Sequence, residues 1–201
     1  MNSIKKEHKI LLFINLALLI CFGILYSLQL NYEFIIYIGV ISFFLFLVGI
    51  TIKKVDYTLS SLIGLTTWSA LHLAGGFFMI GDVRLYDYIP FPLSETYPIL
   101  RYDQIVHIWG FGAATLVSFS MLLKTLKFPI THHIPLGIVL VMAGLGIGAL
   151  NEIMEFGVSI SVPESQIGGY MNTSLDLCAD LIGAILGLIL IRFSPKYKQV
   201  K

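Results

Sequence analysis

Long apolar runs follow one another along the chain. Runs without Lys, Arg, Asp or Glu extend over residues 10–32, 34–52, 57–81, 104–123 and 133–151. A helix needs roughly 20 apolar residues to cross the hydrocarbon core of a bilayer, which is about 30 Å thick. Each run is therefore long enough for one crossing. A sixth run, over residues 174–191, reaches this length only with Asp176 and Asp180 inside it, and the fifth continues past Glu152 and Glu155 in the same way.

This pattern predicts an all-α fold, a polytopic membrane helix bundle of six transmembrane helices. We expect the helices at about residues 10–32, 34–52, 57–81, 103–123, 134–160 and 174–192, in a single integral membrane domain over residues 1–201. The first run follows three lysines and resembles a signal peptide. It is longer than a usual signal-peptide core and has no small-x-small cleavage site, so a retained helix is the better interpretation.

Basic residues are divided unequally between the two predicted sides of the membrane. Of the 13 Lys and Arg residues, only Arg84 and Arg101 fall on the side opposite the termini, which leaves eleven on the side that holds both termini. Basic residues in short loops are enriched on the cytoplasmic side. The count therefore predicts that the N- and C-termini are cytoplasmic.

The composition excludes several classes of protein. Hydrophobic residues make up 57% of the chain and charged residues 12%, against about 25% charged residues in ordinary globular domains. Soluble enzymes, disordered chains and nucleic-acid-binding domains are excluded, because too little charge is present to coat a soluble surface. We expect membrane lipids as partners and no nucleic acid.

Ionisable side chains occur inside four of the predicted spans. Each costs about 2.5–3.5 kcal/mol on insertion scales, so such residues are functional candidates. The alternating direction of the helices places all of them in the outer third of the bilayer. They are His72, Asp103, His107, Glu152, Glu155, Asp176 and Asp180.

The spacing of these residues predicts one shared polar pocket. Residues three or four apart lie on the same face of a helix. Three pairs have this spacing: Asp103 with His107, Glu152 with Glu155, and Asp176 with Asp180. Glycines four apart, Gly144 with Gly148 and Gly183 with Gly187, are typical of closely packed membrane helices.

Five carboxylates cannot all stay ionised in an apolar environment without cations, and Arg101 can pair with one at most. Either the carboxyl groups share protons, or a divalent metal ion binds among them, since carboxylate and imidazole at this spacing form metal sites in helix bundles. The candidate metal ligands are His72, His107, Glu152, Glu155, Asp176 and Asp180. The candidate catalytic residues are Asp103, His107, Glu152 and Glu155, with Arg101 as a substrate contact.

Three stretches carry a resemblance to known families: residues 102–107 (YDQIVH), 151–156 (NEIMEF) and 176–183 (DLCADLIG), continuing to Gly187. Here the chain resembles YjdF-like bacterial inner-membrane proteins and, more distantly, VanZ-like proteins. Glu155 and Asp180 stand where the VanZ-like pattern has Gln and Asn, so the YjdF-like pattern fits better. The resemblance implies a multi-pass protein of the bacterial cytoplasmic membrane with no established reaction. A VanZ-like relationship would loosely imply tolerance of glycopeptides directed at the cell envelope.

Three kinds of function remain open. The cluster suits a metal- or proton-assisted enzyme that acts on envelope lipids or their headgroups, with Asp103 and His107 activating water or a hydroxyl. A cation- or proton-coupled transporter is the second hypothesis, although transporter sites usually lie at the midplane between repeats. The third is a non-enzymatic accessory factor. The segment 82–102 is either a lid over the site or a loop lying on the bilayer.

Overall fold

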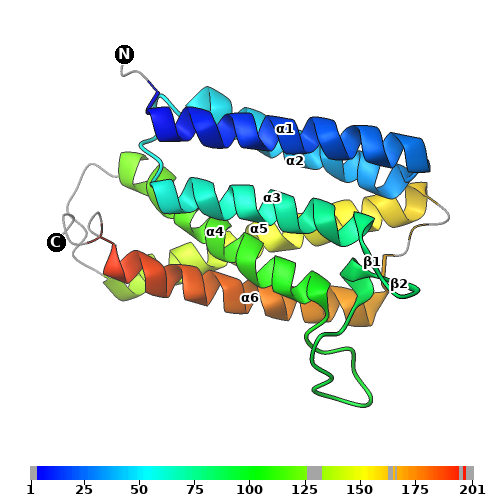
Figure 1. Cartoon of the computed structure of the whole chain (residues 1–201). Helices are drawn as coiled ribbons and strands as arrows, with labels where there is room; N and C mark the ends of the chain where they lie inside the picture. Colours follow the sequence, from blue (N-terminus) through cyan, green and yellow to red (C-terminus); the bar gives the residue numbers. More distant parts are fainter. Residues whose placement is uncertain (1–3, 126–132, 163–164, 166, 195–196, 198–201) are drawn as a thin grey trace.

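Six long helices run side by side along one axis in the computed structural model (Figure 1). The structure describes residues 4–125, 133–162, 165, 167–194 and 197. Within these residues the long helices are α1 (Lys6–Gln29), α2 (Tyr32–Thr51), α3 (Leu59–Phe77), α4 (Tyr102–Thr125), α5 (His133–Ser161) and α6 (Tyr170–Phe193). The start of α1 and the end of α6 lie at the same end of the bundle (Figure 1).

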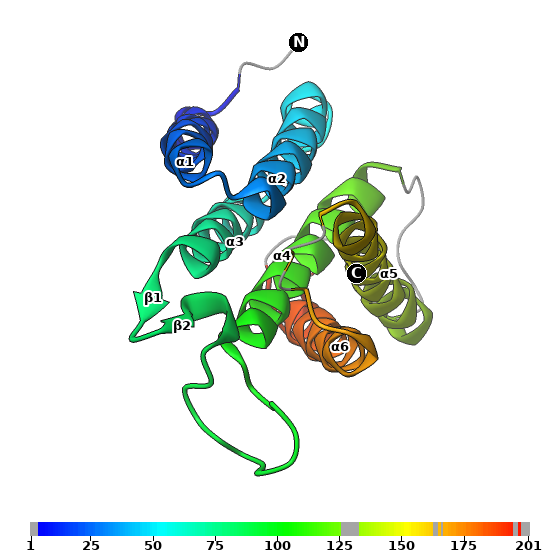
Figure 2. The same cartoon turned by 90° about the vertical axis from the view of Figure 1, so that its right-hand side faces the viewer.

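Helix α4 lies at the centre of the bundle. It packs against α3 on one side and against α5 and α6 on the other, while α1 and α2 lie beyond α3 (Figure 2). The contact between α4 and α6 is the closest because glycines form it. A Cβ atom on Gly183 would lie 2.3 Å from the carbonyl oxygen of Ile108, and one on Gly187 would lie 2.6 Å from that of Gly112. The backbones therefore touch, as the glycine spacing predicts.

The third helix is shorter than predicted. It ends at Phe77, and a hairpin of β1 (Met79–Ile80) and β2 (Val83–Arg84) follows, with Gly81 at the turn in a positive-φ conformation. The prediction that this helix continues to residue 81 is wrong, because an uncharged run does not by itself specify helical backbone. A 3-10 helix, η1 (Leu85–Asp87), then packs against α3 and α4.

Five of the long helices are long and apolar enough to cross a membrane: α1, α2, α4, α5 and α6. Helix α3 is the exception because it carries many polar residues. These face into the bundle, where Ser61, Thr66, Ser69 and His72 are all buried. The part of the chain that the structure describes is thus all-α apart from the hairpin, and most of its long helices have the composition of membrane spans.

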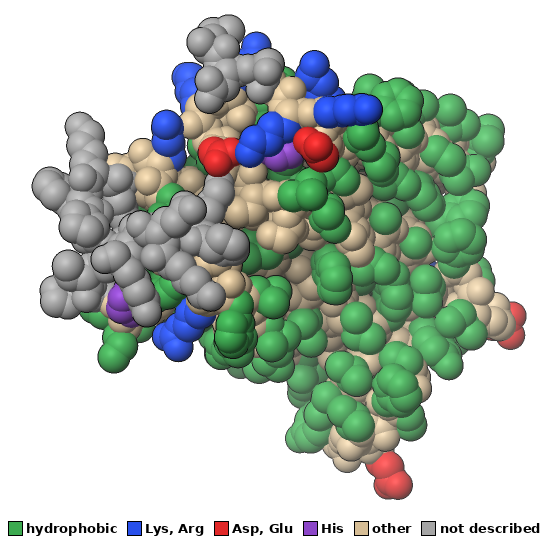
Figure 3. Space-filling model, turned by 60° about the vertical axis from the view of Figure 1, so that its left-hand side comes forward, with side chains coloured by type: hydrophobic (Ala, Val, Ile, Leu, Met, Phe, Trp, Pro, Cys, Tyr) green, Lys and Arg blue, Asp and Glu red, His purple; other side chains and the backbone are tan. Residues whose placement is uncertain are grey.

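The surface divides into an apolar flank and a basic end (Figure 3). Hydrophobic side chains cover most of the visible flank, and Lys and Arg side chains gather at one end. Lys5, Lys53, Lys54 and Lys124 line one shared pocket at the end where α1 begins. This separation of charge is typical of a protein that crosses a membrane.

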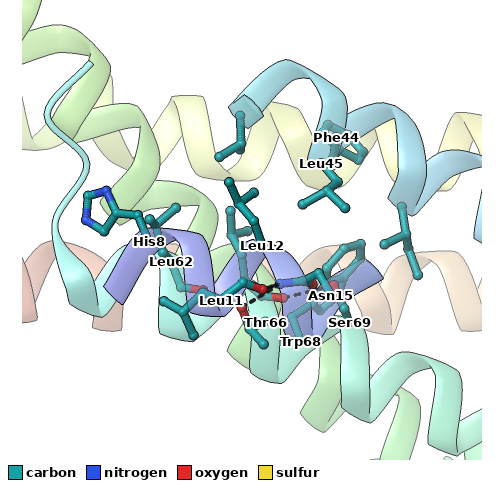
Figure 4. Close-up of a pocket in the computed structure, with 13 residues that line it drawn as sticks. His8, Leu11, Leu12, Asn15, Phe44, Leu45, Leu62, Thr66, Trp68 and Ser69 are labelled. Carbon is teal, nitrogen blue, oxygen red and sulfur yellow. Dashed lines mark hydrogen bonds between the residues drawn. The ribbon is translucent and has the colours of Figure 1, made fainter. Parts of the chain in front are cut away.

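A buried polar pair joins α1 to α3 beside a small cavity (Figure 4). The Asn15 side-chain amide donates hydrogen bonds to the hydroxyl oxygen of Thr66 at 2.7 Å and to the carbonyl oxygen of Leu11 at 2.9 Å. Phe44 and Leu45 of α2 line the same cavity, whose volume is about 40 Å³. Hydrogen bonds of this kind connect helices where hydrophobic burial supplies little driving force.

Candidate functional site

Six of the seven ionisable residues predicted to form a pocket lie together at the end of the bundle that carries β1 and β2. They come from three helices, two from each of α4, α5 and α6, and none is more than 7% exposed. The six are Asp103, His107, Glu152, Glu155, Asp176 and Asp180.

His107 lies at the centre of this acidic cluster. Its Nδ1 atom is 2.8 Å from Oδ1 of Asp180, and its Nε2 atom is 3.5 Å from Oδ1 of Asp103. Glu152 and Glu155 approach the ring at 3.8 Å and 3.9 Å. With the ring proton on Nδ1, His107 donates a hydrogen bond to Asp180 and leaves Nε2 free as an acceptor or a metal ligand.

A glycine makes room for the Asp180 side chain. A Cβ atom on Gly148 would lie 2.1 Å from Oδ2 of Asp180, so no other residue at this position of α5 is compatible with the observed carboxylate. The small residues of α5 and α6 thus shape the acidic cluster as well as the helix contact. The close approach also fixes Asp180 against the imidazole ring of His107.

Several carboxylate oxygens of the cluster are buried without a hydrogen-bond partner among the described residues. They are Oδ1 of Asp103, both carboxylate oxygens of Glu152, Oδ1 of Asp176 and Oδ2 of Asp180. Leaving a buried acceptor unsatisfied costs about 1–3 kcal/mol, and more for a charged group. A cation or added protons among these oxygens, which come from three helices around one imidazole, would satisfy them.

The donor set fits a divalent metal ion. Two overlapping groups have possible ligand atoms that all lie within 4.8 Å of one another: Asp103, His107 and Asp176, and His107, Glu152 and Glu155. Carboxylate oxygen and imidazole nitrogen are suitable ligands for several divalent metals. The Asp180–His107 hydrogen bond matches the common arrangement in which a carboxylate orients a metal-binding histidine through its other ring nitrogen.

His72 lies beside the cluster and belongs to neither group of possible ligands. Its Nδ1 atom is 2.7 Å from the Tyr86 hydroxyl, and aromatic rings, including those of Phe34, Tyr37 and Trp68, surround it. Burial raises the pKa of the Tyr86 hydroxyl well above its usual range, so the hydroxyl stays protonated, and the tautomer of His72 decides which of the two groups donates. The structure therefore places His72 in an aromatic cage.

Arg101 reaches the cluster through an asparagine. Its Nη1 atom donates to Oδ1 of Asn172 at 2.9 Å, and the Asn172 amide donates to Oδ2 of Asp176. Nη1 also lies 3.3 Å from Asp87, which in turn pairs with Arg84 at 3.1 Å. The Nε atom of Arg101 is buried without a hydrogen-bond partner among the described residues.

Three residues of the site were not predicted from the sequence. Asn151 donates to Oε1 of Glu155 at 2.8 Å, and Asn172 and Tyr86 make the contacts described above. Asn172 extends the spacing of Asp176 and Asp180 by one helical turn, and Asn151 precedes Glu155 by four residues, so the same periodicity identifies both. Tyr86 lies in the loop segment and carries no such signal.

Comparison with known proteins places the chain in a family. No curated protein and no solved structure matches it. The sequence model of a family described as predicted membrane protein (DUF2238) matches residues 8–196, which is nearly the whole chain. The chain therefore belongs to the DUF2238 family of predicted membrane proteins.

Proposed function

We propose that the acidic cluster binds a divalent metal ion and that the protein is an enzyme acting on an anionic lipid headgroup of the cell envelope. The observation that carries this proposal is the set of buried carboxylate oxygens without partners around His107. In an apolar environment, several negative groups need a compensating cation to persist at neutral pH. Within the cluster, His107 is the only residue that can carry a positive charge.

The ligand assignment follows the two groups of nearby atoms. Nε2 of His107 with Asp103 and Asp176 forms one set, and His107 with Glu152 and Glu155 forms the other. Asp180 holds the imidazole through Nδ1 and acts as a positioning residue. This differs from the sequence-based expectation, which placed Asp180 among the metal ligands.

The proposed chemistry divides the remaining work among the side chains. A bound divalent ion would supply Lewis-acid activation of a water or a phosphoryl oxygen. One carboxylate oxygen of Glu152 would bind the ion, and the other, which also has no hydrogen-bond partner among the described residues, would accept a proton from an attacking water or hydroxyl. Arg101 would contact the headgroup anion through Nε, as guanidinium groups commonly do with phosphate.

The proposal includes the placement of the chain in a membrane. All six long helices, including α3, would cross the bacterial cytoplasmic membrane with both termini in the cytoplasm, and the cluster would lie in the outer third of the bilayer. The excess of Lys and Arg at the opposite end supports this orientation. The YjdF-like resemblance, and the more distant VanZ-like one, agree with a multi-pass envelope protein.

Metal binding by the purified protein tests this function. We expect the wild type to bind about one Mn²⁺ or Zn²⁺ ion per chain, and Glu152→Gln and Asp176→Asn to weaken binding at least tenfold, as in other metal sites. Glu95→Gln is the matched control, because Glu95 is exposed in the loop outside the cluster. A wild type that binds neither ion, or a Glu152→Gln variant that binds like Glu95→Gln, would overturn the proposal.

The lipid composition of host membranes distinguishes an enzyme from a transporter. Expression of the wild type should alter the amount of a phosphate-bearing lipid, and Glu152→Gln should not. Metal binding without any change in lipids would favour the cation- or proton-coupled transporter.

A further inference from the structure

An apolar cleft separates α2 from α3, α4 and α5. Its volume is about 290 Å³, and all of its lining residues are uncharged. On α4 the small residues Gly110 and Ala114 line the cleft, and on α2 Phe44 and Leu47 form the facing wall. In the view along the bundle, α2 and α5 lie on opposite sides of this region (Figure 2).

The cleft reaches the acidic cluster at one end. Asn151 of α5 lines it, and the same side-chain amide donates to Oε1 of Glu155 at 2.8 Å. Trp68 of α3 also lines it, and the Trp68 ring centroid lies 5.6 Å from that of His72. Asn151 is therefore the polar group at which an apolar channel meets the buried carboxylates.

We infer that this cleft binds one hydrocarbon chain of a membrane lipid and presents the lipid headgroup at Asn151 to the acidic cluster. The headgroup part of the inference rests on the proposed function. The uncharged lining excludes an ionic ligand within the cleft. A space of about 290 Å³ lies just below the size range of small-molecule pockets, about 300–1,000 Å³.

The position of the cleft favours a chain from the surrounding bilayer over another occupant. Two of its lining residues, Leu47 and Met121, are 37% and 45% exposed, so the cleft opens on the flank of the bundle. That flank is apolar and would face lipid. The side chains that line an empty cleft lack van der Waals partners on one side, and a hydrocarbon chain entering from the bilayer would supply them. Van der Waals packing is a main source of stabilisation between groups inside a membrane.

Tryptophan fluorescence gives a direct test, because Trp68 and Trp109 are the two tryptophans of the chain. In a Trp109→Phe background, all tryptophan emission comes from Trp68, which lines the cleft and also the small cavity of Figure 4. We expect vesicles of phosphatidylcholine with brominated chains to lower Trp68 emission at least twofold relative to vesicles of the unbrominated lipid. An equal emission in the two lipids would overturn the inference.

Plugging variants show whether the quenching chain lies in the cleft. Ile147→Phe and Leu47→Phe enlarge residues that line it, and each should restore at least half of the lost emission. The matched controls are Leu150→Phe on α5 and Ile50→Phe on α2, which change exposed residues of the same helices outside the cleft. If one of the two plugging variants fails to fold, the other still tests the inference. Quenching that is the same in plugged and control variants would place the lipid elsewhere and overturn the inference.

A single-chain competitor tests the position of the headgroup. Dodecyl phosphate should relieve quenching at a concentration several-fold lower when Mn²⁺ is present, whereas dodecyl maltoside should show no dependence on Mn²⁺. Relief by dodecyl phosphate that is independent of Mn²⁺, in a protein that binds Mn²⁺, would overturn the headgroup placement. A wild type that binds no metal but shows cleft-dependent quenching would overturn the proposed function and leave the chain site standing.

Discussion

The contact between α4 and α6 makes Gly183→Ala a sharp test of how helix packing supports the site. The new Cβ atom would lie 2.3 Å from the carbonyl oxygen of Ile108, whereas real Cβ atoms essentially never approach other atoms within 3.0 Å. The helices must therefore separate by at least 0.7 Å, the difference between these two distances. Ile108 adjoins His107, and Gly183 lies one turn after Asp180, so the separation acts directly on the pair at the centre of the cluster.

The size of the effect follows from two terms. A direct separation of 0.7 Å would stretch the His107–Asp180 contact from 2.8 Å to about 3.5 Å, beyond the range of a hydrogen bond. Losing a hydrogen bond to a charged group costs about 1.5–3 kcal/mol, and overpacking costs about 1–3 kcal/mol. The higher helix propensity of alanine offsets about 1 kcal/mol. We expect Gly183→Ala to lower the free energy of unfolding by about 1.5–5 kcal/mol.

Equilibrium unfolding in mixed micelles measures this change, and Gly146→Ala provides the matched control. Gly146 lies in α5, and an added Cβ there would meet no atom within 4 Å. That variant should be as stable as the wild type or slightly more stable. The affinity for Mn²⁺ should fall in Gly183→Ala and stay unchanged in Gly146→Ala. If the two variants unfold at the same denaturant concentration, α4 and α6 do not touch as described and the reasoning fails.

Three further changes test other parts of the structure. Reporters fused after residue 201 and within residues 88–100 should report opposite sides of the membrane, and signals from the same side would contradict the six-span topology. Asn15→Leu removes the hydrogen bond to Thr66 and should cost about 0.5–1.7 kcal/mol in the unfolding assay; no cost would mean that the pair does not join α1 to α3. Tyr86→Phe leaves Nδ1 of His72 without its partner and should cost about 1–3 kcal/mol in the unfolding assay; an unchanged stability would mean that the Tyr86 hydroxyl does not hold His72.

The helical bundle could be predicted because apolar runs of membrane length are a strong signal. The run at residues 34–52 became α2, within two residues at either end. The signal failed where the absence of charge did not coincide with helical backbone. Residues 79–81 are uncharged but form the hairpin, whose turn at Gly81 depends on local backbone conformation. The last helix begins at Tyr170, four residues before its predicted start. Its first turn holds the polar residue Asn172, which is buried and donates a hydrogen bond to Asp176, so polarity there did not mark the end of the helix.

The membership of the acidic cluster could also be predicted, but its pairing could not. Spacing of three or four residues identifies side chains on one face of a helix. Because the three pairs lie at the same depth along their helices, the faces that carry them can meet. Spacing does not determine which contact is shortest. Asp103 lies four residues before His107 in α4, yet Asp180 of α6 makes the 2.8 Å contact and Asp103 remains at 3.5 Å. That choice depends on the close approach of α4 and α6 at Gly183.

The ion pairs formed by the segment of residues 82–102 give a reason for a lipid to reach the acidic cluster from the side of the bundle. Arg84 and Arg101 pair with Asp87 across the end of the bundle, and Arg101 holds Asn172 against Asp176. Under this network Asp176 is 0% exposed. A headgroup approaching along the bundle axis would have to break these ion pairs. A lipid entering the cleft would meet uncharged walls up to Asn151, so the fold favours a lateral route from the bilayer to the site.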